Sequence, residues 1–510
     1  MPRFKEYNQG QTVMLPVSFD RQILPGTFEY TLNYLVDEKL DLSIFHHKYN
    51  NHETGRPAYD PALLLKIVIL DYSRGVTSSR KIEALCCENV LFMALSADTQ
   101  PHFTTIADFI SSSSDEIAKL FKQVLLICDE MGLIGKEMFA IDGCKLPSNA
   151  SKEWSGTKTN LRKKSKKIDR AVRHMLDKHR DEDSKGENDI SIRKREKKQI
   201  ETLLKASDKI DRFLNENDER LGYSGKEVQS NITDNESAKM KTSNGVIQGY
   251  VGISAVDSKH QVVVSAEAYG QGQEHGLLEP MVEQIEEAFN EDEQSPLQEG
   301  KVLADSGFCN KATLEYLEAG EIDGYIADHG FRSRDPRFKD AGEHKTESPR
   351  RVSSKSRFSV DEFTVDTENM SCICPTGKKL WLKCAKATIR DTVFMQFQGH
   401  KEDCDNCSER GKCLRSVKQK GARQVNVKIG TIAREKTGPL ERMKQKIDSS
   451  IGRHIYSMRL GIVEPVFGHI NDAIGIKRFS FRGKKKVNGQ WQLMNMLHNL
   501  TKIHRFGMAI

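Results

Sequence analysis

Short apolar stretches alternate with amphipathic ones between residues 138 and 330, and this alternation restricts the fold more than any other feature of the sequence. Runs rich in β-branched residues predict strands, and runs with apolar residues at helical spacing predict helices. The expected strands are residues 138–143, 249–257, 260–269, 301–308 and 322–330, and the expected helices are residues 275–289 and 310–320. The order strand, strand, strand, helix, strand, helix, strand predicts an α/β fold with a mixed sheet flanked by helices.

The chain has 510 residues, which suggests three or four domains at roughly 100–200 residues each. Its 78 Lys and Arg residues exceed its 72 Asp and Glu residues by only six, so the location of charge matters more than the total. No run approaches the roughly 20 apolar residues of a membrane span, and residues 1–10 lack the apolar segment of a signal peptide. We therefore expect a cytoplasmic protein with no membrane partner.

Residues 1–135 are predicted to form an all-helical domain of short helices joined by tight turns. Residues 60–75 and 78–96 each have apolar residues at helical spacing. Thr105 with Asp108, and Ser113 with Glu116, have the spacing of a capping box at a helix start. Such helices suit a helix-turn-helix-like DNA-binding domain, but a scaffold or dimerisation domain fits them equally well.

Two insertions interrupt a core that we expect to span residues 136–330 and 451–510. Residues 158–180 carry ten Lys or Arg residues against two acids, so residues 158–215 are predicted to form a charged helical hairpin. A solvated helix pair and a contact with the DNA backbone are both compatible with this charge. Residues 331–450 are polar, basic and cysteine-bearing, and are predicted to form a second inserted lobe.

Three acidic residues follow or interrupt apolar segments of the predicted core. Asp142 and Asp305 each end an apolar strand and precede a small residue, where a turn-capping role is the alternative to a functional one. Glu464 lies in the apolar run "GIVEPVFG", between Gly461 and Gly468. Converging carboxylates suit Mg²⁺, and two such ions about 3.5–4 Å apart can hold the attacking and leaving oxygens of a phosphoryl transfer.

Several motifs resemble those of the DDE transposases of bacterial insertion sequences, and most of all the group numbered eleven eighty-two. The stretches that carry the likeness are "RPAYDPALLLKIVIL", "FAIDGCKLPSNAS", "TDNESAKMK", "VLADSGF", "YSMRLGIVEPVFGHI" and "RFSFRGKKKVNGQWQLMNMLHNLTKI". They occur in the family's order and cover nearly the whole chain. One departure is Asn471, which stands where many related transposases have Lys or Arg.

The resemblance implies an RNase H-like catalytic core in which Asp142, Asp305 and Glu464 are catalytic and bind two Mg²⁺ ions, with Mn²⁺ as a substitute. It also implies cleavage at the terminal inverted repeats of a transposon and direct transfer of the 3′-OH to target DNA. The partners would be double-stranded DNA and further copies of the chain, in a dimer or larger synaptic complex at the nucleoid. A catalytically inactive DNA-binding descendant and a stand-alone RNase H-like nuclease are the alternatives.

Six of the eleven cysteines fall between residues 372 and 413, which in a reducing compartment favours metal over disulfides. Four of them have the spacing C-x29-C-x2-C-x5-C and are candidate ligands of a structural Zn²⁺: Cys374, Cys404, Cys407 and Cys413. Cys372 and Cys384 compete for the same role, and buried thiols without a metal are the alternative.

Six basic residues and no acid occur between residues 477 and 486, interleaved with Phe479 and Phe481, a pattern that suits a nucleic-acid track. The DNA-binding candidates are Arg459, Lys477, Arg478, Arg482 and Lys484. A structural ion pair for Arg459 and a solvated charge run for the others are the alternatives. Packing roles are expected for Tyr456, Trp491 and His498, and a capping or packing role for His275.

Overall fold

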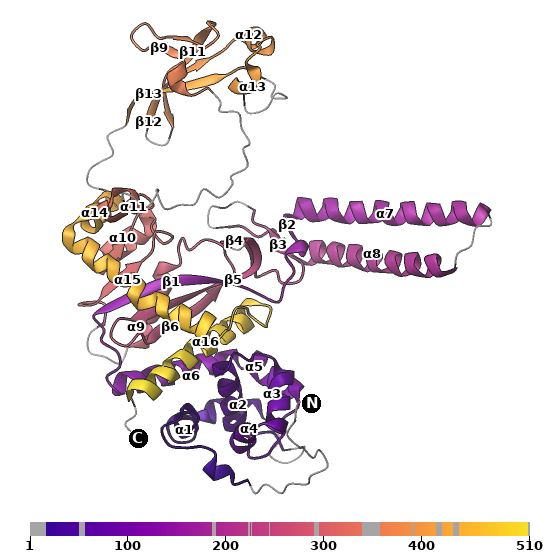
Figure 1. The fold of residues 1–510 in the computed structure, drawn as a ribbon, viewed down its shortest axis with the longest axis vertical. Helices are drawn as coiled ribbons and strands as arrows, with labels where there is room; N and C mark the ends of the chain where they lie inside the picture. The colour runs from indigo at the N-terminus through magenta and orange to yellow at the C-terminus, as the bar shows by residue number, and fades with distance from the viewer. Residues whose placement is uncertain are drawn as a thin grey trace, which may run out of the picture. The chain divides into compact units, whose positions relative to one another are not determined.

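A computed structural model describes residues 17–49, 57–185, 190–222, 225, 227–243, 245–289, 295–338, 358–389, 392–414, 421–431 and 438–507. The chain divides into two compact units. The first comprises Met1–Asp328 with Ser449–Ile510, and the second is His329–Asp448. Figure 1 shows the helices and strands of both units.

A mixed sheet forms the centre of the first unit. Its strands are β1 (Met138–Pro147), β4 (Ala238–Thr242), β5 (Gly245–Asp257), β6 (Val263–Tyr269), β7 (Lys301–Ala304) and β8 (Asp323–Ile326). The order is β4-β5-β1-β7-β8, and β6 also pairs with β5. β1 is antiparallel to β5 and parallel to β7, which is parallel to β8. The helices α9 (Leu278–Ala288) and α10 (Lys311–Ala319) follow β6 and β7. This arrangement confirms the predicted α/β, RNase H-like class.

β1 is longer than we predicted. We expected a strand that ends at Asp142, but β1 continues to Pro147 because β5 pairs with it along its whole length, from Phe139 opposite Asp257 to Pro147 opposite Gly249. Asp142 therefore lies in the middle of the strand, opposite Ser254. Its backbone is held by the sheet, so a turn-capping role is excluded.

Helices form the N-terminal part of the first unit, as predicted. They are α1 (Phe28–Tyr34), α2 (Pro61–Ser73), α3 (Ser79–Glu88), α4 (Val90–Leu95), α5 (Phe103–Ser112) and α6 (Ser114–Glu130). The single helix expected at residues 78–96 is two helices, because Asn89 is extended and its side chain caps α4 by accepting a hydrogen bond from the Leu91 N–H. The capping box expected at Thr105 and Asp108 is also wrong, since the N-cap of α5 is His102, three residues earlier.

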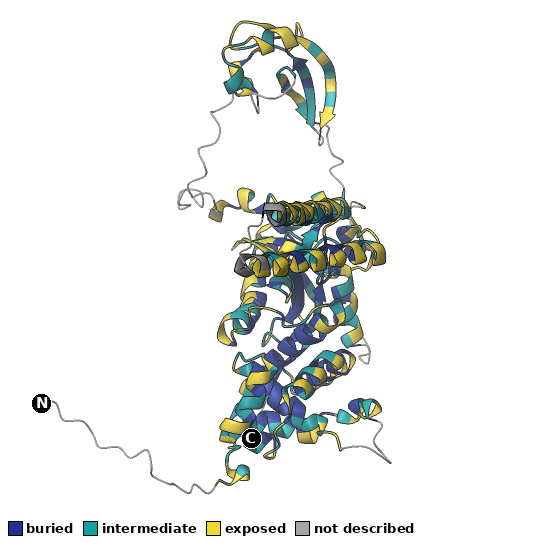
Figure 2. Cartoon of the chain, turned by 90° about the vertical axis from the view of Figure 1, so that its right-hand side faces the viewer, coloured by how far each residue is buried: buried dark blue, intermediate teal, exposed yellow. Residues whose placement is uncertain are grey.

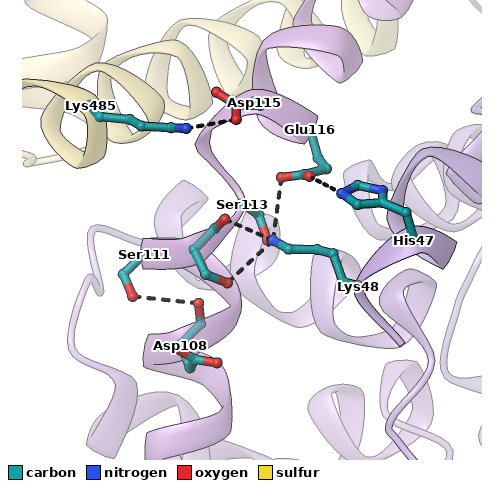
Figure 3. Close-up of polar contacts among 9 residues, drawn as sticks. His47, Lys48, Asp108, Ser111, Ser113, Asp115, Glu116 and Lys485 are labelled. Carbon is teal, nitrogen blue, oxygen red and sulfur yellow. Dashed lines mark hydrogen bonds and ion pairs between the residues drawn. The ribbon is translucent and has the colours of Figure 1, made fainter. Parts of the chain in front are cut away.

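The second expected capping box, at Ser113 and Glu116, is replaced by contacts with other segments (Figure 3). Lys48 Nζ donates to Ser113 Oγ at 2.8 Å, and Glu116 pairs with both Lys48 and His47. On the neighbouring position of the same helix turn, Asp115 pairs with Lys485 from the C-terminal part of the chain, at 2.7 Å. Contacts with other segments therefore stabilise the first turn of α6, and the Ser113 side chain makes no capping hydrogen bond.

Helix α16 (Lys484–Lys502) lies between the sheet and the N-terminal helices, and most of its residues are buried (Figures 1 and 2). Trp491 is fully buried and donates from Nε1 to the Ile253 carbonyl at 2.9 Å. Gln490, the preceding residue, donates to the Tyr72 hydroxyl of α2 at 3.0 Å. One helix thus packs on both layers, and the packing roles expected for Trp491 and His498 are confirmed by their burial.

The charged insertion forms two long helices, α7 (Lys158–Lys185) and α8 (Ile190–Glu216), drawn side by side in Figure 1. At the base of the pair, Leu161, Ile210 and Phe213 form a small apolar cluster with Trp154. The short strands β2 (Ser155–Gly156) and β3 (Ser230–Asn231) pair beside this base. Most of the basic side chains of α7 are exposed.

The second unit contains an antiparallel sheet in the order β13-β12-β11-β10-β9. The strands are β9 (Thr364–Asp366), β10 (Ser371–Ile373), β11 (Lys379–Ile389), β12 (Thr392–Gln398) and β13 (Gln424–Thr431). The helices are α11 (Phe331–Arg334), α12 (Lys401–Asp405), α13 (Arg410–Cys413) and α14 (Pro439–Asp448). Its apolar core is small and is centred on Phe363, Phe397 and Cys372.

Helix α15 (Ser450–Gly468) returns the chain to the first unit and contains Pro465 in its interior. Proline removes the N–H that would bond the carbonyl four residues earlier. That carbonyl belongs to Gly461, and the Gln261 side chain bonds to it at 2.9 Å instead. The sequence left open whether the helix begins or kinks near Glu464. The structure shows that it passes through this residue and continues into a π-helical turn at His469–Ala473.

Candidate active site

Two carboxylates meet because two parallel strands are in register. Ile141 of β1 is the partner of Ala304 of β7. The next residues of the two strands are Asp142 and Asp305, which therefore lie beside each other at the edge where open α/β sheets bind their ligands. Each carboxylate accepts a backbone N–H close by, Asp142 from Gly143 at 2.8 Å and Asp305 from Gly307 at 2.7 Å.

Arg459 of α15 reaches the same place. Its Nη1 lies 2.5 Å from Asp142 Oδ2, and the two side chains are only 9% and 19% exposed. Burial raises the pKa of Asp142, Arg459 opposes that rise, and Asp305 adds to it. Arg459 is therefore engaged in the ion pair that we considered as the alternative to a phosphate contact, and binding a phosphate would require this pair to open.

Tyr456 lies one helical turn before Arg459, whose guanidinium is 5.8 Å from the centre of the tyrosine ring. Burial is the main cause of a raised pKa of the Tyr456 phenol, and the charges of Asp305 and Asp142 add to it. The phenol thus faces the two aspartates, so Tyr456 borders the site in addition to packing.

A third carboxylate at this edge belongs to Glu274, which the sequence analysis did not single out. Glu274 lies in the connection between β6 and α9. Burial, followed by the charges of Asp305 and Asp142, raises the pKa of the Glu274 carboxyl to about 7. The sequence carried no comparable signal, because Asp305 directly follows β7, whereas Glu274 stands five residues beyond the end of β6.

Glu464, by contrast, has an exposed side chain on α15. At 100° per residue it points about 140° away from Arg459 around the helix. Gly461 and Gly468 on the same face have open space where a Cβ would stand, so this face is bare, as its sequence suggested.

The carboxylates of Asp142, Asp305 and Glu274 at the sheet edge fit a hard divalent cation, because such cations prefer oxygen ligands. Too little positive charge from the protein compensates these carboxylates. Arg459 supplies positive charge to Asp142, while Glu274 remains partly protonated near pH 7. As the described side chains stand, however, no three His, Cys, Asp or Glu residues are arranged to hold a metal ion. Binding a cation would therefore require these side chains to move, first of all Asp142 away from Arg459.

The four candidate zinc ligands lie around one pocket of the second unit, although among the described residues they are not arranged to hold a metal ion as they stand. Cys374, Cys404, Cys407 and Cys413 line one pocket, together with His400. The competing Cys372 is fully buried in the apolar core, and Cys384 lies on β11 outside the pocket lining. Burial opposes ionisation of Cys374, but hydrogen bonds from Thr376 and the Lys378 N–H lower its pKa below the usual range. A thiolate is the form of cysteine that binds metals.

The basic segment before α16 is only partly free. Arg478 is exposed, and Lys477 forms an exposed pair with Asp472 at 3.4 Å. Arg482 donates to the Asn149 carbonyl, and Lys484 pairs with Glu267 at 2.9 Å.

Phe479 does not match the expected nucleic-acid track. It is fully buried and meets the Trp491 ring edge-on at a centroid distance of 6.1 Å, so it is not available to stack on a base. The cations and aromatic residues alternate in this segment because buried Phe479 anchors it to the core.

Comparisons with known families indicate the class of protein to which the fold and the paired aspartates point. A family model described as a transposase DDE domain matches residues 373–504, and a model described as a transposase domain matches residues 17–112. Together these two matches support an insertion-sequence DDE transposase. Searches of curated proteins and of solved structures gave no match.

The first match contains Arg459 and Glu464, whereas Asp142, Asp305 and Glu274 lie outside both matches. The roles of those three residues therefore depend on their positions in the fold, and the group number eleven eighty-two stays a prediction. Among the helices that the structure describes, none has the length and apolar character to cross a membrane.

Proposed function

We propose that the protein cleaves DNA strands at transposon ends and joins them to target DNA, with Asp142, Asp305 and Glu464 as the catalytic carboxylates. The observation that carries this proposal is the register of β1 and β7, which sets two acids side by side at the edge of an RNase H-like sheet. The family matches support the enzyme class, and the carboxylate donors support Mg²⁺, for which Mn²⁺ can substitute.

The roles of the protein groups follow from their places in the site. Asp142 and Asp305 would hold two Mg²⁺ ions, which when bound lower the pKa of a water and stabilise charge on the scissile phosphate. Arg459 keeps Asp142 compensated until then. The bare face of α15 between Gly461 and Gly468 gives a DNA backbone room to approach Glu464.

The test is cleavage of labelled duplexes made from the DNA that flanks the gene, with Mg²⁺ or Mn²⁺. We expect Asp142→Asn and Glu464→Gln to abolish cleavage, because each change removes the negative charge of a proposed catalytic carboxylate. Each change leaves the side-chain volume almost the same, so the loss would not come from altered packing. Glu279→Gln, on the exposed side of α9, is the matched control and should cleave like the wild type. Undiminished cleavage by Asp142→Asn would refute the proposal.

One observation favours a second candidate, an inactive DNA-binding protein descended from a transposase. Glu464 is exposed and, among the described residues, no three acids are arranged to hold a metal ion, so the triad implied by the family is not assembled. Specific binding of the flanking DNA by the wild type, without cleavage under any metal condition, would establish this candidate. Cleavage without transfer to a second DNA would instead indicate a stand-alone nuclease.

We also propose that Cys374, Cys404, Cys407 and Cys413 bind a structural Zn²⁺. The lining of one pocket by these four sulfurs supports the proposal, and a unit with so small an apolar core would gain stability from a metal. The partners that we propose are the terminal inverted repeats, target DNA and further copies of the chain in a synaptic complex at the nucleoid. Exposed Arg478 and Lys477 are the best placed of the predicted DNA contacts.

A further inference from the structure

The carboxylate that accompanies Asp142 and Asp305 is that of Glu274, and its position follows from the topology. β6 and β1 are both antiparallel to β5, so β6 runs in the same direction as β1 and β7. The connection after β6 therefore leaves the sheet at the edge where Asp142 and Asp305 stand. Glu274 lies in that connection, five residues beyond the end of β6.

Two glycines show how closely Glu274 approaches the aspartates. A Cβ atom on Gly307 would stand 2.3 Å from Glu274 Oε2 and 2.9 Å from Asp305 Oδ1. A Cβ atom on Gly143, the residue after Asp142, would stand 2.9 Å from Glu274 Oε1. Gly143, one residue after Asp142, and Gly307, two residues after Asp305, thus leave the space that the Glu274 carboxylate occupies. Because one point lies within 2.9 Å of oxygens from both Glu274 and Asp305, the two carboxylates are close neighbours at this edge of the sheet.

The carboxylate of Glu274 is half-buried and poorly compensated. Within the described residues it accepts no hydrogen bond and forms no ion pair, and the cations that act on it, Lys145 and Arg459, act only at longer range. Placing a carboxylate beside two others without a donor is costly. A structural role would give Glu274 a partner, whereas a cation-binding role explains both its neighbours and its lack of one.

We propose that Glu274 is a metal-ligating residue of the catalytic centre, where it adds its carboxylate to those of Asp142 and Asp305. This inference rests on the proposed function, because it assigns Glu274 to the same cations. The set of metal ligands implied by the family is Asp142, Asp305 and Glu464. The inference adds Glu274, from the β6–α9 connection, to this set, and Glu464 would still join from α15.

The test measures Mn²⁺ binding to the full-length chain without DNA, by electron paramagnetic resonance. We expect Glu274→Gln to weaken binding at least tenfold, and Gly307→Ala to weaken it similarly, because the added methyl displaces oxygens of both Glu274 and Asp305. Glu279→Gln is the control and should bind like the wild type. Thermal unfolding in metal-free buffer checks that the variants fold, and Glu274→Gln should be no less stable than the wild type there.

The outcomes separate the two proposals. Loss of Mn²⁺ binding in Asp305→Asn, with wild-type binding in Glu274→Gln, overturns the role of Glu274 and leaves the proposed function intact. Failure of the wild type to bind Mn²⁺ and to cleave DNA overturns both. Weakened binding in Glu274→Gln and Gly307→Ala, with normal binding in Glu279→Gln, supports the inference even where no cleavage substrate is known.

Discussion

Replacement of Arg459 by Met tests whether its guanidinium holds the site together when no cation is bound. The change keeps most of the aliphatic volume but leaves Asp142 without its counter-charge, 2.5 Å away in the wild type. Removing one partner of a buried pair costs roughly 3–5 kcal/mol. Because Asp142 is still 19% exposed, we expect the lower end, about 3 kcal/mol at pH 8 without divalent cations.

The deficit should depend on pH in a defined direction. Burial and Asp305 already raise the pKa of Asp142, and loss of Arg459 raises it further. The penalty acts on the ionised carboxylate, so it is complete above the raised pKa and disappears as the pH falls toward the ordinary value of 3.8, where Asp142 is protonated whether folded or unfolded. Added Mg²⁺ should also reduce the deficit, because a cation can then compensate Asp142.

The assay is urea unfolding followed by tryptophan fluorescence, in which buried Trp491 reports on the unit that contains the site. Lys477→Met, which breaks only an exposed pair with Asp472, is the control and should unfold like the wild type. A deficit for Arg459→Met that is equal at pH 4 and pH 8, or one below about 1 kcal/mol at pH 8, would refute this reasoning about the buried pair.

Three further predictions concern other parts of the molecule. Gly252→Ala should destabilise the first unit by about 1–3 kcal/mol in the same unfolding assay, because its Cβ would stand 2.6 Å from Trp491 Cε2; an unchanged midpoint would contradict this contact. Both carboxylate oxygens of Asp71 are buried without a partner among the described residues, and burial raises the pKa of this carboxyl to about 7. The free energy of unfolding of the wild type should therefore fall between pH 4 and pH 7, by up to about 4 kcal/mol more than that of Asp71→Asn. Parallel pH curves for the two proteins would contradict this prediction. We expect the purified wild type to carry zinc, measured by elemental analysis, and we expect Cys407→Ser to lose it and Cys384→Ser to keep it; equal zinc in both variants would exclude the proposed ligand set.

The order of secondary structure could be predicted from the sequence because it depends on local periodicity. The alternation of apolar strands and amphipathic helices between residues 138 and 330 is the alternation found in the sheet, and the basic run at residues 158–180 lies on one of two long helices. Local patterns failed where a tertiary partner replaced a local one. Ser113 and Glu116 have capping-box spacing, but Lys48 and His47 bind them instead.

The residues of the candidate site also divide into those that the sequence marked and those that only the tertiary structure revealed. The sequence by itself marked Asp142 and Asp305, because each ends a predicted apolar strand and precedes a small residue. It marked Glu464, because a lone acid within an apolar run is unusual, and Arg459 as a cation five residues before it. It did not mark Glu274, because the residues between β6 and α9 have no periodicity and their place depends on the direction in which β6 runs. Only the tertiary structure decided which carboxylates stand together, since contacts between side chains far apart in sequence follow from strand register and helix rotation. Those two quantities set Glu274 beside the aspartates, gave Asp142 the guanidinium of Arg459 and turned Glu464 toward solvent.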